Sequence, residues 1–183
     1  LFETRRREEA LAAFDAALSA DPENERAHRG KGLSLTRLGR YEDAIISLDR
    51  ALEPDPSNPE ILSCKGYSLY RLGRNKEAVE AFSKSLKKRP ENLFVHFFRG
   101  KALFRLDRWN DAATSFASVI RIDGNHAAAW YFRGICLSNL DSHTEALDAF
   151  THTLATDDGC IAAWYRKGME LVLLGQPEEG IAA

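Results

Sequence analysis

Apolar residues recur every three to four positions within segments of the chain that are long enough to be helices. Leu33, Leu35 and Leu38 form one such stripe, and Leu103 and Leu106 belong to another. This spacing places side chains on one face of an α-helix, whereas a half-buried strand would alternate every second residue. The pattern therefore predicts an all-α chain of amphipathic helices.

The expected helices come in pairs, because signals that end a helix are followed closely by signals that begin one. Each first helix stops at a residue type that tolerates left-handed backbone. These residues are Gly39, Gly73, Asp107, Asp141 and Gly175. Acidic residues come next, and they are favourable at the positive N-terminal end of a second helix. They are Glu42, Asp43, Glu77, Asp111, Glu145, Glu178 and Glu179.

The pattern repeats with a period of 34 residues. Glycines mark it at Gly32, Gly66, Gly100, Gly134 and Gly168, alanines at Ala10, Ala44, Ala78, Ala112 and Ala146, and bulky apolar residues at Phe14, Leu48, Phe82, Phe116 and Phe150. A fixed period of this length indicates stacked units, because one helix pair cannot bury its apolar face alone. We expect the two helices of a pair to approach closely where small residues meet. The expected pairs are Gly32 with Ala44, Gly66 with Ala78, Gly100 with Ala112 and Gly134 with Ala146.

With this period and these residues, the chain resembles the tetratricopeptide repeat (TPR) family, whose unit carries the pattern W-x2-L-G-x2-Y…A-x3-F…P. The best matches to its aromatic position are Trp130 before Gly134 and Trp164 before Gly168. The same position departs from the pattern in earlier units, at His28, Leu62 and His96. Pentatricopeptide repeats have a slightly longer period and lack these small residues, so they are disfavoured. The resemblance implies a right-handed α-α superhelix, or TPR solenoid, of antiparallel helix pairs.

In this register, residues 1–183 form a single TPR solenoid. We expect a partial repeat at 1–24 that is mainly a second helix, full repeats at 25–58, 59–92, 93–126 and 127–160, and a truncated repeat at 161–183. Because both ends cut through a repeat, we expect a fragment of a longer TPR array. Its ends would lack polar capping helices and could support self-association.

Composition narrows the functional classes. The chain has 25 basic and 27 acidic residues, a net charge of −2, which disfavours nonspecific nucleic-acid binding. No apolar run approaches the roughly 20 residues of a membrane span, and residues 1–10 contain no apolar targeting segment. The three cysteines form no CxxC pair and indicate neither a disulfide framework nor a zinc site. We therefore expect a cytoplasmic protein without membrane or nucleic-acid partners.

Candidate chemistry is sparse, so we predict no catalytic residues, no metal site and no cofactor. His28 and His96 occupy the aromatic position and are expected to be half-buried with satisfied ring nitrogens. His143 and His152 are nine residues apart, which does not place them on one helix face, and we expect both to face solvent. The chain also lacks GxxxxGK[ST], GxGxxG and GxSxG motifs. The protein is therefore expected not to be an enzyme.

What the resemblance does imply is a binding groove, since the first helices of TPR units line a concave surface. It assigns to the groove Arg29, Arg37, Tyr67, Tyr70, Arg71, Phe94, Phe97, Phe98, Lys101, Phe104, Arg105, Tyr131, Phe132, Asn139, Tyr165 and Arg166. Aromatic residues and arginine are enriched at binding hot spots. Some of these rings are instead expected to pack between helices, because a ring in the groove also leans on its neighbour.

Charge favours an acidic ligand for this surface. The five first-helix segments hold twelve basic and three acidic residues, a local charge of +9. The basic residue before each period glycine can instead extend over the core, and leaving out that row gives +4. We expect an interaction scaffold that binds a protein or peptide with apolar and acidic side chains. Two alternatives stay open: a substrate-recognition arm of a larger enzyme, and an element that self-assembles end to end.

Overall fold

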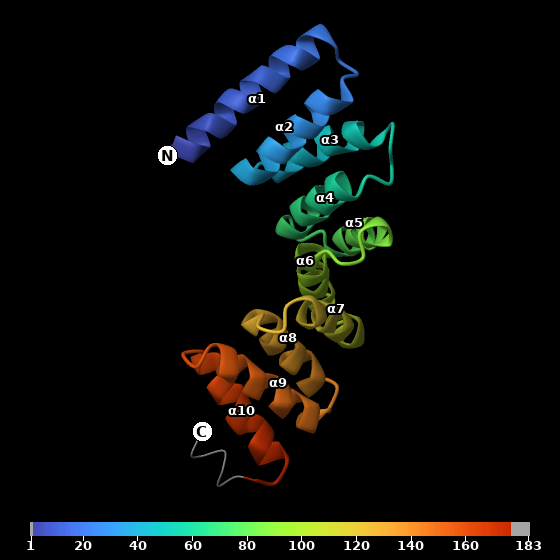
Figure 1. Ribbon diagram of the computed structural model, residues 1–183. Helices are drawn as coiled ribbons and strands as arrows, with labels where there is room; N and C mark the ends of the chain where they lie inside the picture. The colour runs from blue at the N-terminus through green and yellow to red at the C-terminus, as the bar shows by residue number, and fades with distance from the viewer. Residues whose placement is uncertain (1, 177–183) are drawn as a thin grey trace. The chain divides into compact units, whose positions relative to one another are not determined.

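The computed structural model describes residues 2–176, with side chains from residue 5 onward, and Figure 1 shows its helices in chain order. The described residues form ten α-helices and no strand. The helices are α1 (Phe2–Ala20), α2 (Glu25–Leu38), α3 (Tyr41–Leu52), α4 (Pro59–Arg71), α5 (Asn75–Lys88), α6 (Leu93–Phe104), α7 (Trp109–Ile122), α8 (Ala127–Ser138), α9 (His143–Thr156) and α10 (Ile161–Leu173). The predicted all-α fold is confirmed, and none of the described helices is both long and apolar enough to cross a membrane.

The helices form two compact units, residues 1–95 and residues 96–183, with the division inside α6. In unit 1, α1 packs against α2, α2 against α3, α3 against α4, and α4 against α5. In unit 2, α7 packs against α8, α8 against α9, and α9 against α10. Figure 1 shows the members of the pairs α2/α3 and α8/α9 side by side. The assignment of residues 1–183 to one solenoid with the repeat limits given above stays a prediction.

Left-handed backbone ends the first helix of each pair, as the sequence predicts. The φ angles are 79° at Gly39, 77° at Gly73 and 78° at Gly175, and 55° and 57° at Asp107 and Asp141. Glycine adopts this conformation without a steric cost, and aspartate is among the residues that tolerate it best. The chain then reverses and starts the second helix, whose first turn carries acidic residues at Glu77, Asp111 and Glu145. Glu178 and Glu179 lie outside the described residues.

The period glycines allow close approach within each pair, but their main partner differs from the expected one. A Cβ atom built on Gly66 would lie 2.7 Å from the ring of Phe82, and one on Gly134 would lie 2.7 Å from the ring of Phe150. Gly100 faces Phe116 and Gly32 faces Leu48 in the same way. The alanines at Ala44, Ala78, Ala112 and Ala146 are fully buried nearby. Glycine is therefore needed at this position because a large side chain, one helical turn beyond the alanine, lies over it.

The aromatic position of the repeat closes the turn that precedes α2, α8 and α10. Nε1 of Trp130 donates to the carbonyl of Gly124 at 2.8 Å, and Nε1 of Trp164 donates to the carbonyl of Asp158 at 2.9 Å. Half-buried His28 makes the equivalent bond, from Nε2 to the carbonyl of Pro22 at 2.8 Å. A carbonyl can only accept, so Nε2 of His28 carries a proton. A histidine at this position thus replaces tryptophan as the donor.

The prediction that His143 faces solvent is wrong. His143 begins α9, and its Nδ1 lies 2.8 Å from Oε2 of Glu170 in α10, a residue that is 1% exposed. A buried carboxylate needs a partner of this kind, because desolvation without one is costly. His152 is half exposed, but its ring stacks on Trp130 with centroids 4.3 Å apart.

Candidate functional site

A cleft of about 460 Å³ lies in unit 1. It is lined by Arg7, Thr36, Arg37, Tyr41, Cys64, Tyr67, Arg71 and Phe94. Four of these eight belong to the predicted groove residues, and side chains from α1, α2, α3, α4 and the start of α6 take part. No aspartate or glutamate is among these lining residues. The cleft therefore combines three cationic side chains with three aromatic rings.

Arg71 is held in place by two tyrosines. Its Nη1 donates to the hydroxyl of Tyr67 at 2.8 Å, and its guanidinium carbon lies 4.9 Å from the centre of the Tyr41 ring. The hydrogen bond from the guanidinium to Tyr67 raises the pKa of Arg71 above its usual value. Tyr67 in turn contacts Tyr41 and Phe94, with ring centroids 6.3 Å and 5.5 Å apart. Arg71 is thus a fixed cation on an aromatic wall.

The repeat explains why arginines meet at this place. Arg37 and Arg71 lie in the last turns of α2 and α4, separated by one period of 34 residues. The helices that carry them are joined by a buried hydrogen bond of 3.0 Å between the hydroxyls of Thr36 and Ser68. Equivalent positions on neighbouring first helices therefore face the same cleft.

Cys64 lines the cleft as a neutral thiol. Burial raises its pKa, and the nearby Arg37 only partly opposes this effect. Because the thiolate is the nucleophile and the metal ligand, the raised pKa favours neither role. The described residues also contain no group of three or more histidine, cysteine, aspartate or glutamate side chains that could hold a metal ion.

Unit 2 fills the corresponding region with aromatic rings. Phe132 lies at the centre, and its ring centroid is 5.4 Å from that of Phe116, 5.5 Å from that of Phe104 and 6.3 Å from that of Phe97. Tyr131 also contacts Phe132, and Phe98 contacts Phe97. Several predicted groove rings therefore pack on one another, as the alternative interpretation expected.

One repeat position differs between the open and the filled region. It holds Gly30 and Cys64 in unit 1, and Phe98, Phe132 and Arg166 in unit 2. The ring of Phe14 occupies the space beside Gly30, whereas the small side chain of Cys64 lines the open cleft. Lys101 crosses the filled region, with its Nζ 5.3 Å from the centre of the Phe132 ring.

The remaining predicted residues are distributed over both units. Tyr70 is 3% exposed and belongs to the core of unit 1, whereas Phe94 is 44% exposed. Arg29 and Arg166 are half-buried, and Arg105 is exposed at the end of α6. Exposed Asn139 donates from Nδ2 to the carbonyl of Ile135 at 2.8 Å, and Tyr165 on α10 is 67% exposed.

The basic residues that precede the period glycines make contacts within their units. Lys31 pairs with Asp15 at 2.6 Å, and Lys65 pairs with Asp49. Nη1 of Arg99 donates to the hydroxyl of Ser115 at 2.7 Å, and burial lowers the pKa of that guanidinium. Arg133 and Lys167 lie over the rings of Trp130 and Trp164. These contacts favour the smaller estimate of groove charge.

Sequence reasoning missed Tyr41 and Arg7 in the cleft. Tyr41 starts a second helix, and the residues one to three periods later at this position are Asn75, Trp109 and His143. Trp109 packs on Phe104, with centroids 5.0 Å apart, and His143 reaches Glu170. A ring-bearing residue at the start of a second helix was therefore a sequence signal that could have identified Tyr41. Arg7 lies one period before Tyr41, at the same repeat position, but it carries no ring.

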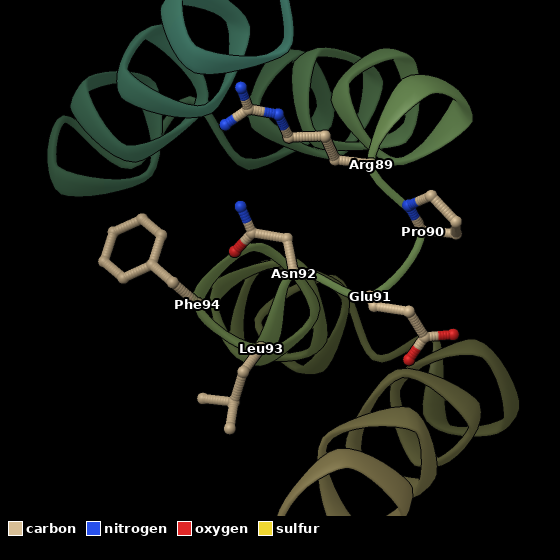
Figure 2. Close-up of a pocket in the computed structure, with 6 residues that line it drawn as sticks. All are labelled: Arg89, Pro90, Glu91, Asn92, Leu93 and Phe94. Atoms are coloured by element: carbon tan, nitrogen blue, oxygen red, sulfur yellow. The ribbon is translucent and has the colours of Figure 1, made fainter.

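A second hollow, of about 640 Å³, lies beside the connection between α5 and α6. Figure 2 shows the six residues that line it, which run consecutively from Arg89 to Phe94. The Asn92 side chain is committed to the start of α6, since its Oδ1 accepts from the backbone N–H of Val95 at 3.1 Å. Residues from one short segment do not bring groups together from separate elements, so the first cleft is the better candidate site.

Comparison with solved structures shows close likeness in fold. The crystal structure of YrrB, "a TPR protein with an unusual peptide-binding site", superposes with a TM-score of 0.85 at 25% identity, covering 94% of this chain and 89% of YrrB. A MamA crystal structure gives a TM-score of 0.82 at 22% identity, covering 88% of each chain. MamA from Desulfovibrio magneticus RS-1 gives 0.79 at 22% identity, covering 86% of this chain and 89% of that one. These likenesses confirm the predicted TPR solenoid fold.

Family models agree with the structural comparison. No curated protein sequence matches the chain. A model of subunit 3 of the anaphase-promoting complex, or cyclosome, matches residues 37–119. The tetratricopeptide repeat model matches residues 1–59 and 99–159, more than half of the chain. The chain therefore belongs to the tetratricopeptide repeat family.

Proposed function

We propose that this protein is a non-enzymatic interaction scaffold that binds a segment of another protein, with acidic and apolar side chains, through the cleft of unit 1. The observation that carries the proposal is the composition of the cleft wall, in which three arginines and three aromatic rings occur without a carboxylate. Aromatic rings supply large rigid contact areas, and arginine forms two-pronged hydrogen bonds with carboxylates. Family membership and the peptide-binding site named for YrrB support the same function.

The proposed ligand places one acidic side chain near Arg37 and Arg71 and an apolar side chain against Phe94. Arg71 is already oriented by Tyr67 and Tyr41, so little side-chain entropy is lost when it binds a carboxylate. Phe94 is 44% exposed, and covering its ring removes apolar surface from water. The predicted groove residues of unit 2 are proposed as contacts on a separate surface, considered by itself.

Peptides selected on the wild-type protein from a random display library test this function. We expect enrichment of Asp and Glu together with apolar residues, and a loss of affinity of at least tenfold for Arg71→Glu in fluorescence anisotropy. The matched control is Arg50→Glu, which makes the same charge change in unit 1 on a side chain that is 58% exposed and pairs with Glu53. Equal affinities for the two variants would refute the cleft as the binding site.

We also propose that the protein works in a reducing compartment such as the cytoplasm. Cys64, Cys136 and Cys160 are all free thiols. Free cysteines are stable in the cytoplasm, whereas oxidising compartments favour disulfides. Fractionation of source cells with an antibody against the chain tests the location, and recovery from a secreted fraction would contradict it.

A second candidate function, self-association, is favoured by the exposed face of α10. Ile161, Tyr165, Met169, Val172 and Leu173 are exposed there. Large apolar side chains grouped on one helix favour association. Sedimentation velocity over a wide range of concentrations tests this function. We expect the double variant Val172→Glu with Tyr165→Glu to abolish any dimer. A wild-type protein that stays monomeric at high concentration would exclude self-association.

A further inference from the structure

The cleft of unit 1 carries more positive charge than a single carboxylate can neutralise. Arg7, Arg37 and Arg71 line it, and they come from three helices, α1, α2 and α4. The other lining residues include a neutral thiol, a threonine and three aromatic side chains. Arg37 and Arg71 alone carry two positive charges, so a ligand group with one negative charge would match only one of them.

Arg71 has donors available for a multivalent anion. A guanidinium has five N–H donors in a planar fork. The hydroxyl of Tyr67 accepts from Nη1 of Arg71, and the ring of Tyr41 lies against the guanidinium at 4.9 Å. These contacts orient the fork and use a small part of its hydrogen-bonding capacity. Such fixed forks match the tetrahedral oxygens of a phosphate group.

The aromatic wall favours an anion that is attached to an aromatic ring. Tyr41, Tyr67 and Phe94 form a continuous series of ring contacts, with centroids 6.3 Å and 5.5 Å apart. The cleft measures about 460 Å³, which is larger than a phosphate group needs and falls in the range of small-molecule sites. A ring bonded to the anion would fill the rest of the space and pack on Phe94.

From this combination we infer that the cleft of unit 1 binds a phosphate monoester carried on an aromatic ring, the chemistry of a phosphorylated tyrosine side chain. A phosphate monoester carries about −1.5 to −2 charge near pH 7 and has three acceptor oxygens, so it can engage Arg37 and Arg71 together. The inference rests on the proposed peptide-binding function and makes its ligand specific.

Phenyl phosphate is the probe, and NMR titration of the complete chain is the measurement. Phenyl sulfate is the first control, because it has the same shape with one negative charge. Methyl phosphate is the second, because it lacks the ring. We expect the dissociation constant for phenyl phosphate to be at least tenfold lower than for either control, with shifted signals at Arg37, Arg71 and Phe94.

Variants separate the two arginines from general charge effects. We expect Arg37→Gln and Arg71→Gln each to weaken phenyl phosphate binding roughly tenfold. Arg50→Gln removes the same charge from an exposed side chain outside the cleft and should have no effect. Circular dichroism checks that each variant keeps its helix content.

The outcomes distinguish this inference from the proposed function. The phosphate inference would be overturned if phenyl phosphate bound no more tightly than phenyl sulfate, or no more tightly than methyl phosphate. Unchanged phenyl phosphate binding by Arg71→Gln would also overturn it. If display-selected acidic peptides still bound in an Arg71-dependent manner, the peptide scaffold would stand while the phosphate preference failed. If neither peptides nor phenyl phosphate bound, both would fail.

Discussion

Glu170 in α10 is 1% exposed, and its carboxylate lies 2.8 Å from Nδ1 of His143 in α9. The two residues are 27 positions apart and join the last two described helices of unit 2. The His143 side chain is 26% exposed, so the pair has one fully buried member and one half-buried member. The pair therefore links α10 to the histidine that begins the preceding helix.

Replacing His143 should destabilise unit 2. His143→Ala leaves the buried Glu170 side chain without this hydrogen-bond partner, and a buried polar group without its partner costs about 1–3 kcal/mol. The free energy of unfolding, measured in urea by the fluorescence of the three tryptophans, which all belong to unit 2, should decrease by an amount in this range.

The matched control is Asp148→Asn, since Asp148 is also in α9 but its side chain is 65% exposed. It should leave the free energy of unfolding unchanged. The double variant His143→Ala with Glu170→Leu removes the buried charge and should recover most of the loss. A wild-type stability for His143→Ala alone would show that the pair is dispensable.

A methyl group at a period glycine should destabilise the helix pair. In Gly66→Ala the new Cβ would lie 2.7 Å from the ring of Phe82, which is fully buried and cannot move away freely. Overpacking of this kind costs about 1–3 kcal/mol, which exceeds the gain of up to about 1 kcal/mol in helix propensity. Thermal unfolding followed by circular dichroism should show a lower Tm. In Gly124→Ala the nearest atom is 3.9 Å away, so its Tm should stay close to that of the wild type.

The buried thiol of Cys136 should make stability depend on alkaline pH. Burial raises the pKa of Cys136 to about 12 from a reference value of 9.0. Between these values the unfolded thiol loses its proton while the folded one keeps it, so stability falls as the pH rises. The free energy of unfolding of the wild type, minus that of Cys136→Ala, should decrease from pH 8 to pH 10. A difference that stays constant over this interval would contradict the buried-thiol assignment.

Local chemistry explains how much of the fold could be predicted. Gly39 and Gly73 end helices because glycine adopts positive φ easily, and this property needs no knowledge of the neighbours. The period of 34 residues located the helix pairs, but it predicted alanines opposite the glycines where the structure places large apolar residues. The same period brought Arg37 and Arg71 into one cleft, since equivalent positions on successive first helices face the same way.

The candidate site depended on packing between residues far apart along the chain. Cys64 leaves a cleft open where Phe132, two periods later, fills the same position with a ring. The sequence contains both residues, but whether a space stays empty depends on the volumes of all the side chains around it. The contacts of Tyr41 with Arg71 and of His143 with Glu170 also depend on packing between distant parts of the chain. The sequence by itself therefore determined the helical repeat, because the signals of that repeat are local. The tertiary structure alone decided which part of the repeated surface is hollow, because a hollow depends on how many side chains pack together.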